Sequence, residues 1–355
     1  MGADRSAVGW TQPPMSFAAR IWPTSIGIVG LVALVLLLVA PPVLIALGAP
    51  FWISIIAEVM IWSLLAASVN LLFGYTGLLS FGQALYFGMA AYGVAFGLDK
   101  LGLPFWPSFA LGIGVGTLTA GVTGVFAVRL TWHYFAIITV VFSLIFYFLS
   151  VGWKDLTNGD DGMPFSVPPV FKFGGLELKL YDLTFQYYFV FVIVALCYLF
   201  LWALLRSPLG LAFRSVRDND QRAGLIGINT YGIRYVSFVI AGFLASVGGV
   251  LFALFARFAT ASYLYWTVSG EGVIWAIVGG TGTLFGPVLG TAVLIVLREE
   301  LSIYWEHYLL VVGAIVILMV RYAPDGLIGL LQWFLAGHRK WESAPGPTVA
   351  KEGQP

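Results

Sequence analysis

Arginines and acidic residues crowd into one stretch of this chain, residues 206–234. The stretch reads RSPLGLAFRSVRDNDQRAGLIGINTYGIR, whereas the tracts on either side of it carry almost no charge. Charges of both signs beside apolar residues suit either docking onto another protein or attachment to anionic lipid headgroups. Because acidic residues are mixed with the arginines, the pattern favours protein docking.

Two carboxylates interrupt tracts that are otherwise apolar. Glu58 lies within the second tract, and Glu271 opens the eighth in the sequence SGEG. A charged group at membrane depth is costly, so each is a candidate for binding a solute, an ion or a proton. The alternative is structural: Glu271 sits at an interface, and Glu58 is protonated or hydrogen-bonded to a neighbouring helix.

Residues 74–83, GYTGLLSFGQ, place glycines beside neutral hydrogen-bonding side chains between two apolar tracts. Free backbone amides and polar side chains suit a dipolar solute that crosses a low-dielectric region. The alternative is a plain glycine turn in which Gln83 caps the following helix. The candidate pathway residues are Tyr75, Thr76, Gly77, Ser80 and Gln83. The later sequence GTLFGP, residues 282–287, combines a glycine turn with an apolar helix and is a candidate counterpart in a second half.

Several kinds of chemistry lack the residues they need. No lysine follows a glycine, so the chain has no P-loop for ATP, and Cys197 with the scattered His133, His307 and His338 offers no metal spacing. The formal net charge of +1 draws no nucleic acid. We therefore expect no metal, no cofactor and no catalytic site on this chain.

The composition points to lipid as the main solvent. Hydrophobic residues make up 60% of the chain and charged residues only 10%, against about 25% charged in an average soluble domain. The apolar tracts predict an all-α polytopic membrane protein with about ten transmembrane helices, because each tract is long enough, or nearly long enough, to cross a bilayer. The predicted spans are 26–48, 51–73, 81–98, 105–128, 132–151, 185–205, 235–257, 269–284, 286–301 and 306–322. The last tracts flank a Gly/Pro break at 279–287 that either turns back as a re-entrant segment or forms a clean loop.

The distribution of Lys and Arg predicts the orientation. With ten crossings, the positive-inside rule places both termini and the 206–234 loop in the cytoplasm, and the loop 152–184 outside. The predicted permease domain is 26–335, preceded by a cytoplasmic segment 1–25 and followed by a disordered tail 336–355. In the outer loop, FKFGGLELKLYD predicts a small β-hairpin around a Gly-Gly turn.

Small residues recur every fourth position in two of the predicted spans. Such ladders let helix backbones approach closely where lipid provides no hydrophobic drive for association. One ladder is Gly112, Gly116, Ala120 and Gly124, and the other is Ala241, Ala245, Gly249 and Ala253. They predict a tightly packed bundle.

The charged loop itself predicts a short amphipathic helix outside the membrane. Ser207 and Pro208 suit the start of a helix, and Gly224 or Gly227 suits its end. Apolar residues then recur at helical spacing, at Leu209, Ala212, Phe213 and Val216.

Five stretches in this order carry a resemblance to a known family. They are NLLFGYTGLLSFGQALYFGMAAYG, YFAIITVVFS, TNGDDGM, SPLGLAFRSVRDNDQRAGLIGIN and GGTGTLFGPVLG. Together they resemble the membrane permease subunits of ABC importers for branched-chain amino acids, over residues 50–330. Close relatives within that family carry urea, short amides or aromatic acids.

The resemblance implies partners and roles. Such permeases pair with a second, related permease, bind two cytoplasmic ATPase subunits that hold ATP and Mg, and receive solute from a binding protein outside a bacterial inner membrane. The helix 208–222 would be the coupling helix that sits in a cleft of the ATPase, and the acids Asp160 and Asp161 would lie where the binding protein docks. The coupling residues so implied are Pro208, Leu209, Phe213, Arg214, Arg217, Asp218 and Arg222.

Two other classes of protein stay open at the level of sequence. An autonomous ion-coupled carrier or channel would use Glu58 and Glu271 as ion or proton sites. A membrane-bound enzyme would use His133 or His307. The apolar tracts contain few ionisable residues that could pass a proton or an ion, which disfavours the carrier. The amphipathic helix of the 206–234 loop, which suits docking onto another protein, favours the importer.

Overall fold

The computed structural model describes residues 35–130, 132–173, 176–178, 180–304, 307–322 and 326–329. The predicted terminal segments 1–25 and 336–355 lie outside these ranges. Contacts divide the chain into a unit of residues 1–53, which contains the helix Val35–Ala46, and a unit of residues 54–355. Helix α2 (Phe51–Asn70) begins just before this boundary, and everything else that follows concerns the second unit.

The chain is mostly helical, as the apolar tracts predict. Its longer helical elements are α2 (Phe51–Asn70), the π-helix η1 (Leu71–Thr76), α3 (Gln83–Asp99), α4 (Phe105–Ala127), α5 (Trp132–Gly152), α7 (Leu183–Arg206), α10 (Thr230–Ala256), α11 (Trp266–Gly279), α12 (Gly286–Tyr304) and α13 (Tyr308–Tyr322). The short ones are α6 (Lys154–Thr157), η2 (Gly159–Asp161), α8 (Pro208–Asp218), α9 (Asp220–Leu225) and η3 (Ala261–Leu264).

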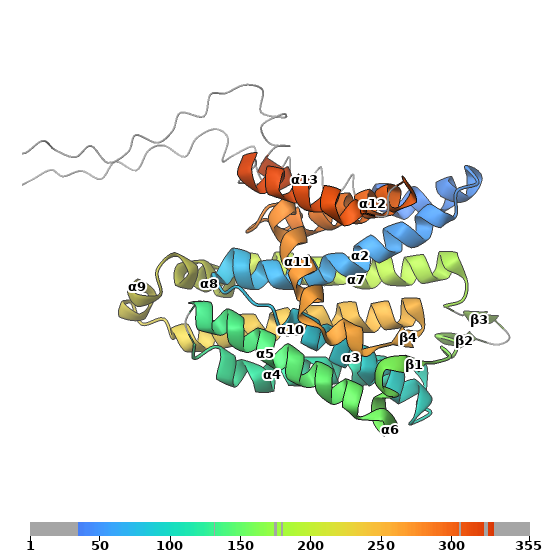
Figure 1. Ribbon diagram of the computed structural model, residues 1–355, viewed down its shortest axis with the longest axis horizontal. Coiled ribbons are helices and arrows are strands. Elements are labelled where there is room, and N and C mark those ends of the chain that lie inside the picture. The colour runs from blue at the N-terminus through green and yellow to red at the C-terminus, as the bar shows by residue number, and fades with distance from the viewer. Residues whose placement is uncertain are drawn as a thin grey trace, which may run out of the picture. The chain divides into compact units, whose positions relative to one another are not determined.

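Five helical segments in the described ranges are long and apolar enough to cross a membrane: 51–76, 105–127, 133–152, 183–206 and 230–256. The total of ten crossings stays a prediction. Helix α11 departs most from a full span, because its 14 residues extend only about 21 Å at 1.5 Å per residue, less than a hydrocarbon core of about 30 Å. It crosses the long helices steeply (Figure 1).

Helices α3, α4 and α10 pack closely against one another, and the predicted small-residue ladders lie at their contacts. A Cβ added at Gly112 of α4 would lie 2.8 Å from the carbonyl oxygen of Ala90 on α3 and 2.7 Å from Val250 on α10. A Cβ added at Gly249 of α10 would collide with the carbonyl group of Phe87 on α3. Small residues therefore let three backbones meet, which confirms the predicted packing role.

The outward faces of the peripheral helices are apolar. Leu118 of α4, Ile137 of α5 and Leu196 of α7 are each more than half exposed. Water would make such faces costly, whereas lipid tails would not, so they fit a bundle that is surrounded by lipid.

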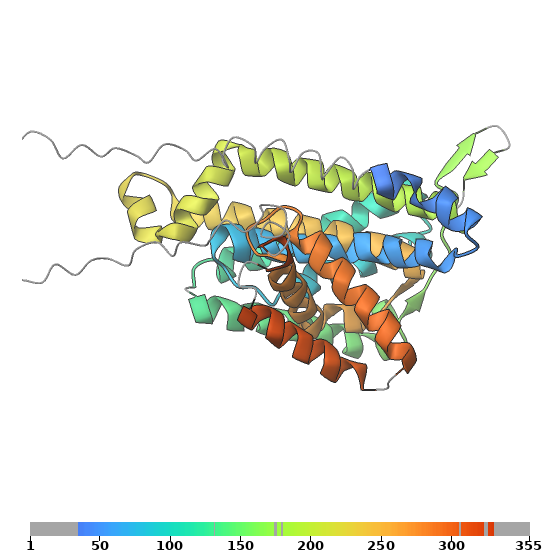
Figure 2. The same ribbon diagram turned by 90° about the horizontal axis from the view of Figure 1, so that it is seen from above.

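Short strands gather at one end of the bundle, opposite α8 and α9 (Figures 1 and 2). Strand β2 (Phe171–Phe173) pairs antiparallel with β3 (Leu176–Leu178), which confirms the predicted hairpin. Strand β1 (Met163–Pro164) pairs with β4 (Phe258–Ala259), a contact that the sequence did not predict. The 24-residue helix α7 connects the two ends.

We predict that Gly116→Ala destabilises the bundle. The added methyl group would collide with the Ser246 hydroxyl and lie 2.7 Å from the carbonyl oxygen of Tyr86, and overpacking of this kind costs about 1–3 kcal/mol. The control is Gly114→Ala on the same helix, where an added Cβ meets nothing within 4 Å. The unfolding temperature in detergent should fall for Gly116→Ala and not for Gly114→Ala. An equal change in the unfolding temperature of the two variants would contradict the packing argument.

Candidate functional site

The helix α2 changes into a π-helix, η1, just where the glycine-rich stretch begins. Gly77 ends η1 with a left-handed φ of 79°, and its backbone N–H donates to the carbonyl group of Leu72. A Cβ added at Gly77 would also lie 3.3 Å from the side chain of Arg217. Single π-turns of this kind interrupt the regular hydrogen-bond ladder of a helix and occur frequently at functional sites.

Asn70 connects this interruption to the second glycine break. Its side-chain amide donates to the carbonyl oxygen of Thr283 at 2.8 Å, and its carbonyl oxygen accepts from the backbone N–H of Gly282 at 2.8 Å. Gly74 packs so closely there that an added Cβ would lie 2.5 Å from the Gly282 nitrogen. The two breaks that the sequence offered as counterparts are therefore in direct contact.

The Thr283 hydroxyl closes the second break on itself. It donates to the carbonyl oxygen of Gly280 at 2.7 Å and accepts from the backbone N–H of Gly286 at 3.1 Å. These bonds satisfy backbone groups at the end of α11 and the start of α12, where neither helix does so.

Helix α8 reaches this contact through its arginines. The Arg217 guanidinium donates a hydrogen bond to the carbonyl oxygen of Gly74, and the Arg214 guanidinium lies 5.6 Å from the ring centroid of Tyr75, within reach of a cation–π interaction. We call the set Asn70, Gly74, Arg217, Gly282 and Thr283 the glycine joint. A movement of α8 would act on both glycine breaks at this joint.

The predicted helix 208–222 is shorter than expected. It begins at Pro208, but it ends at Asp218 because Asn219 is extended and its side chain accepts from the N–H of Arg222, capping a second helix, α9. Side-chain capping of this kind competes with helix continuation. The Ser207 hydroxyl, expected to cap α8, bonds back to the carbonyl oxygen of Leu204 at 2.6 Å.

The α8–α9 segment has a buried side and an exposed side. Phe213 and Val216 are buried against the bundle, whereas Leu209, expected on the same apolar face, is 40% exposed. Pro208, Asp218 and Arg222 are also exposed. The further exposed apolar side chains of this segment are Leu211, Leu225 and Ile226. The exposed side thus offers apolar and charged groups to a partner.

The neutral polar residues of the 74–83 stretch are buried among helices. Thr76, Ser80 and Gln83 are at most 3% exposed. Thr76 bonds to the carbonyl oxygen of Leu71 at 3.1 Å, and the side chain of Gln83 lies 3.5 Å from the Ser80 hydroxyl. In this conformation they satisfy local backbone and side-chain groups.

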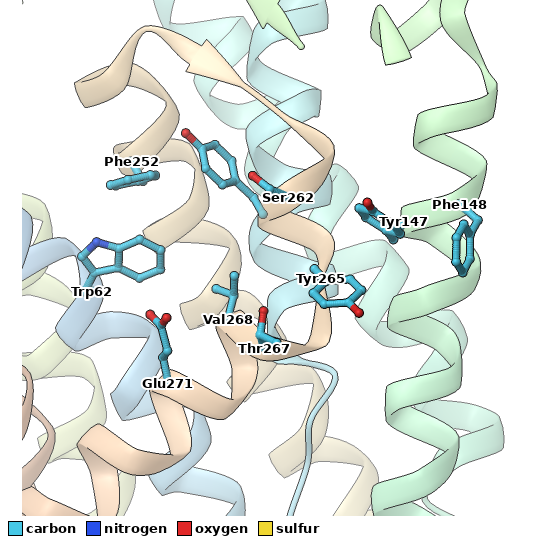
Figure 3. Close-up of a pocket in the computed structure, with 10 residues that line it drawn as sticks. Trp62, Tyr147, Phe148, Phe252, Ser262, Tyr265, Thr267, Val268 and Glu271 are labelled. Atoms are coloured by element: carbon cyan, nitrogen blue, oxygen red, sulfur yellow. The ribbon is translucent and has the colours of Figure 1, made fainter. Parts of the chain in front are cut away.

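A cavity of about 580 Å³ opens beside α11, away from the joint. Its walls are mainly aromatic: Trp62, Tyr147, Phe148, Phe252, Tyr263 and Tyr265. Ser262, Thr267 and Glu271 supply polar groups. In Figure 3 the Glu271 carboxylate and Trp62 lie on one side of this space, and Tyr147 and Phe148 lie on the other.

The two carboxylates of the apolar tracts have different surroundings. The indole N–H of Trp62 donates to Glu58 at 3.1 Å, so Glu58 holds the orientation of a cavity wall. That indole also stacks on Phe87, with ring centroids 5.0 Å apart. Glu271 is exposed to the cavity itself. The sequence singled out both acids without indicating this connection.

Asp160 and Asp161 are exposed on the short helix η2, at the end of the bundle that carries the strands. The Asn158 side chain braces their turn by donating to the carbonyl oxygen of Gly162 at 2.8 Å. Strands β1 and β4 connect this turn to the backbone that leads into η3 and the cavity. Within the described residues, no group of His, Cys, Asp and Glu could hold a metal ion.

The sequence reasoning missed Asn70, Thr283 and Trp62. An asparagine inside an apolar span must find partners, which is a signal for Asn70. Trp62 follows Glu58 by four residues, a spacing that places both side chains on one helix face. Thr283 lies within the 282–287 stretch that the sequence offered as a counterpart, but its residue type did not indicate the bonds that it makes there.

Comparison with known proteins shows that one protein family matches most of the chain. The family described as "Branched-chain amino acid transport system / permease component" matches residues 51–320. The LivM permease protein of the high-affinity branched-chain amino acid transport system of Salmonella typhimurium is 26% identical over 88% of this chain and 78% of its own length. The LivM permease protein of Escherichia coli is 28% identical over 84% of this chain and 74% of its own length. The LivH permease protein of the same system in Salmonella typhimurium is 29% identical over 39% of this chain and 46% of its own length. No solved structure matches the chain.

We predict that Asn70→Leu weakens the joint. The substitution removes both hydrogen bonds to the 282–283 backbone and leaves an N–H and a carbonyl group there without that partner. Because these groups are partly buried, the cost for each is at most that of a fully buried group, about 1–3 kcal/mol. Thr119→Val is the control, because that hydroxyl bonds only to the carbonyl oxygen of Val115 in its own helix. The unfolding temperature should fall more for Asn70→Leu than for Thr119→Val. An unchanged unfolding temperature for Asn70→Leu would contradict the role given to Asn70.

Proposed function

The chain belongs to the family of permease components of branched-chain amino acid transport systems, and from this premise we propose that it is the membrane-spanning subunit of an ATP-driven importer. It would translocate branched-chain or related amino acids, delivered by a solute-binding protein, by alternating access. The observation that carries the proposal is the glycine joint. Helix α8, which has one exposed side, is bonded through Arg217 to the π-helix η1. Asn70 in turn bonds this interruption of the helix to the turn between α11 and α12.

The side chains that α8 and α9 expose support the proposal of an ATPase partner. Leu211 and Leu225 are 62% and 87% exposed beside arginines and acids, which suits a groove in a protein better than a lipid surface. The chain has no P-loop of its own, so ATP and Mg would be bound by two separate ATPase subunits. Closure of those subunits would push α8, and the joint would pass the displacement to η1 and to the α11–α12 turn.

The proposal of two further partners is supported by the opposite end of the bundle and by the relatives. LivM and LivH carry the name of one transport system in one organism, and both resemble this chain. A second, related permease is therefore the proposed partner in the membrane. The exposed acids of η2, Asp160 and Asp161, with the β2–β3 hairpin, form the proposed docking side for a binding protein. Urea, short amides and aromatic acids are the alternative cargoes within the same family.

The proposed location is a bacterial inner membrane with both termini and α8 in the cytoplasm. We predict that, in a Cys197→Ala background, Leu211→Cys reacts with an impermeant thiol reagent only after the membrane is opened, whereas Asp161→Cys reacts in intact spheroplasts. Both positions are exposed, and Cys197 is the chain's only cysteine. The reversed labelling pattern would overturn the assignment of α8 to the ATPase side.

We predict that Arg217→Gln uncouples the transporter. In proteoliposomes that contain both permeases, both ATPases and the binding protein, solute uptake should fall about tenfold or more while ATP hydrolysis continues. The reason is that the variant loses a charge-assisted hydrogen bond to Gly74, worth about 1.5–3 kcal/mol. Arg129→Gln is the control, because Arg129 lies in the α4–α5 loop and contacts the Tyr231 ring instead.

Two results would contradict this function. If Arg217→Gln transports like the unaltered protein, α8 does not act through the joint. If the purified chain moves solute down an ion gradient without ATPases or binding protein, the ion-coupled carrier is the correct class.

A further inference from the structure

The cavity beside α11 carries a single formal charge. Of the residues that line it, Glu271 is the only acid and none is a base. Glu271 shares one face of α11 with Thr267 and Val268, at spacings of four and three residues, and Figure 3 shows all three side chains on the cavity side of that helix. The electrostatic character of the cavity is therefore set by one carboxylate.

Glu271 has no ion pair within 4.0 Å among the described residues. Arg298 of α12 acts on it through electrostatic attraction without forming a salt bridge. Glu58, in contrast, accepts a hydrogen bond from Trp62. A carboxylate in an apolar setting needs a cation, a hydrogen-bond donor or water beside it. The cavity is where such a group has room.

The rest of the cavity suits an apolar side chain. Aromatic rings dominate its walls, and Tyr147 and Tyr265 pack together with ring centroids 5.0 Å apart. Its volume of about 580 Å³ lies within the range of about 300–1,000 Å³ for small-molecule sites. The hydroxyls of Ser262 and Thr267 add hydrogen-bond donors that can face a carboxylate of the ligand.

This combination discriminates among small solutes. An organic anion without an amino group would meet the Glu271 charge, and no residue that lines the cavity is a base that could bind the anion, in a medium that strengthens the repulsion. Urea would satisfy the carboxylate but would leave the aromatic walls unfilled. A ligand with an ammonium group next to an aliphatic side chain satisfies both parts, and aromatic faces also attract a cation.

We infer that this cavity is a transit site for zwitterionic aliphatic amino acids, in which Glu271 binds the ammonium group, the aromatic walls hold the side chain, and Ser262 and Thr267 face the carboxylate. The inference rests on the proposed function and names the class of solute that the membrane subunit itself recognises. It excludes aromatic acids without an amino group, and urea, as preferred cargoes.

The test uses the full transporter in detergent, without the binding protein, and three ligands of matched shape. They are L-leucine, isoamylamine, which lacks the carboxylate, and isocaproate, which lacks the ammonium group. We expect leucine and isoamylamine to bind at least about tenfold more tightly than isocaproate, the scale of one charge-assisted bond. Glu271→Gln should remove that preference, and Glu271→Asp should keep part of it.

Glu300→Gln is the matched control, because Glu300 is an exposed acid of α12 that does not line the cavity. It should bind all three ligands as the unaltered protein does. Equal binding of leucine and isocaproate, unchanged selectivity in Glu271→Gln, or no binding of any ligand at millimolar concentration would each overturn the inference. So would loss of the second permease from the purified Glu271→Gln complex, because Glu271 would then be a contact between subunits.

The outcome separates this inference from the proposed function. If ATP-driven uptake of leucine continues in Glu271→Gln with unchanged selectivity, only the transit site is wrong. If the ammonium preference is found but solute moves without the ATPases, the site stands and the importer class is wrong.

Discussion

An interrupted helix inside an apolar bundle must find partners for the backbone groups that it leaves unpaired, and this constraint shapes both ends of the proposed mechanism. Arg217 supplies such a partner at η1, through the carbonyl group of Gly74, and the side chains of Asn70 and Thr283 supply them at the α11–α12 turn. Because Asn70 directly precedes η1 and binds Gly282 and Thr283, the two interruptions are also bonded to each other, and we expect movement of one break to affect the other. A requirement of backbone chemistry thereby produces a mechanical connection.

The stiffness of the remaining bundle gives that connection its use. Glycines such as Gly112 and Gly249 bring the backbones of α3, α4 and α10 into contact, and interiors packed this closely respond to force by moving as bodies. The joint instead consists of hydrogen bonds at turns, which can be exchanged for others at small cost. A push on α8 is therefore expected to change the joint before it deforms the central helices.

The local sequence pattern predicted the positions of most helices and strands, but few of the contacts between them. The tract 105–128 became α4 at Phe105–Ala127, and the β2–β3 hairpin and the start of α8 at Pro208 lie where expected. The end of α8 was wrong because capping by Asn219 competes with helix propensity. The contact of Asn70 with Gly282 spans 212 residues, and no periodicity encodes a pairing at that separation. The two acids were recognised by their cost in lipid, yet many aromatic residues fill these tracts, so residue type did not reveal which of them face Glu271.

The separation of the cavity from the joint matters for how coupling and recognition combine. Helix α11 contributes Glu271 to the cavity and ends at Gly279, where the turn of the glycine joint begins. A short, regular helix transmits displacement along its axis without changing its own hydrogen bonds. A ligand held at Glu271 would therefore bias the joint only by favouring one position of α11, and the proposed ATP-driven movement of the joint would change the cavity through the same helix. Because linkage is reciprocal, one rigid element suffices to couple solute binding to movement of α8.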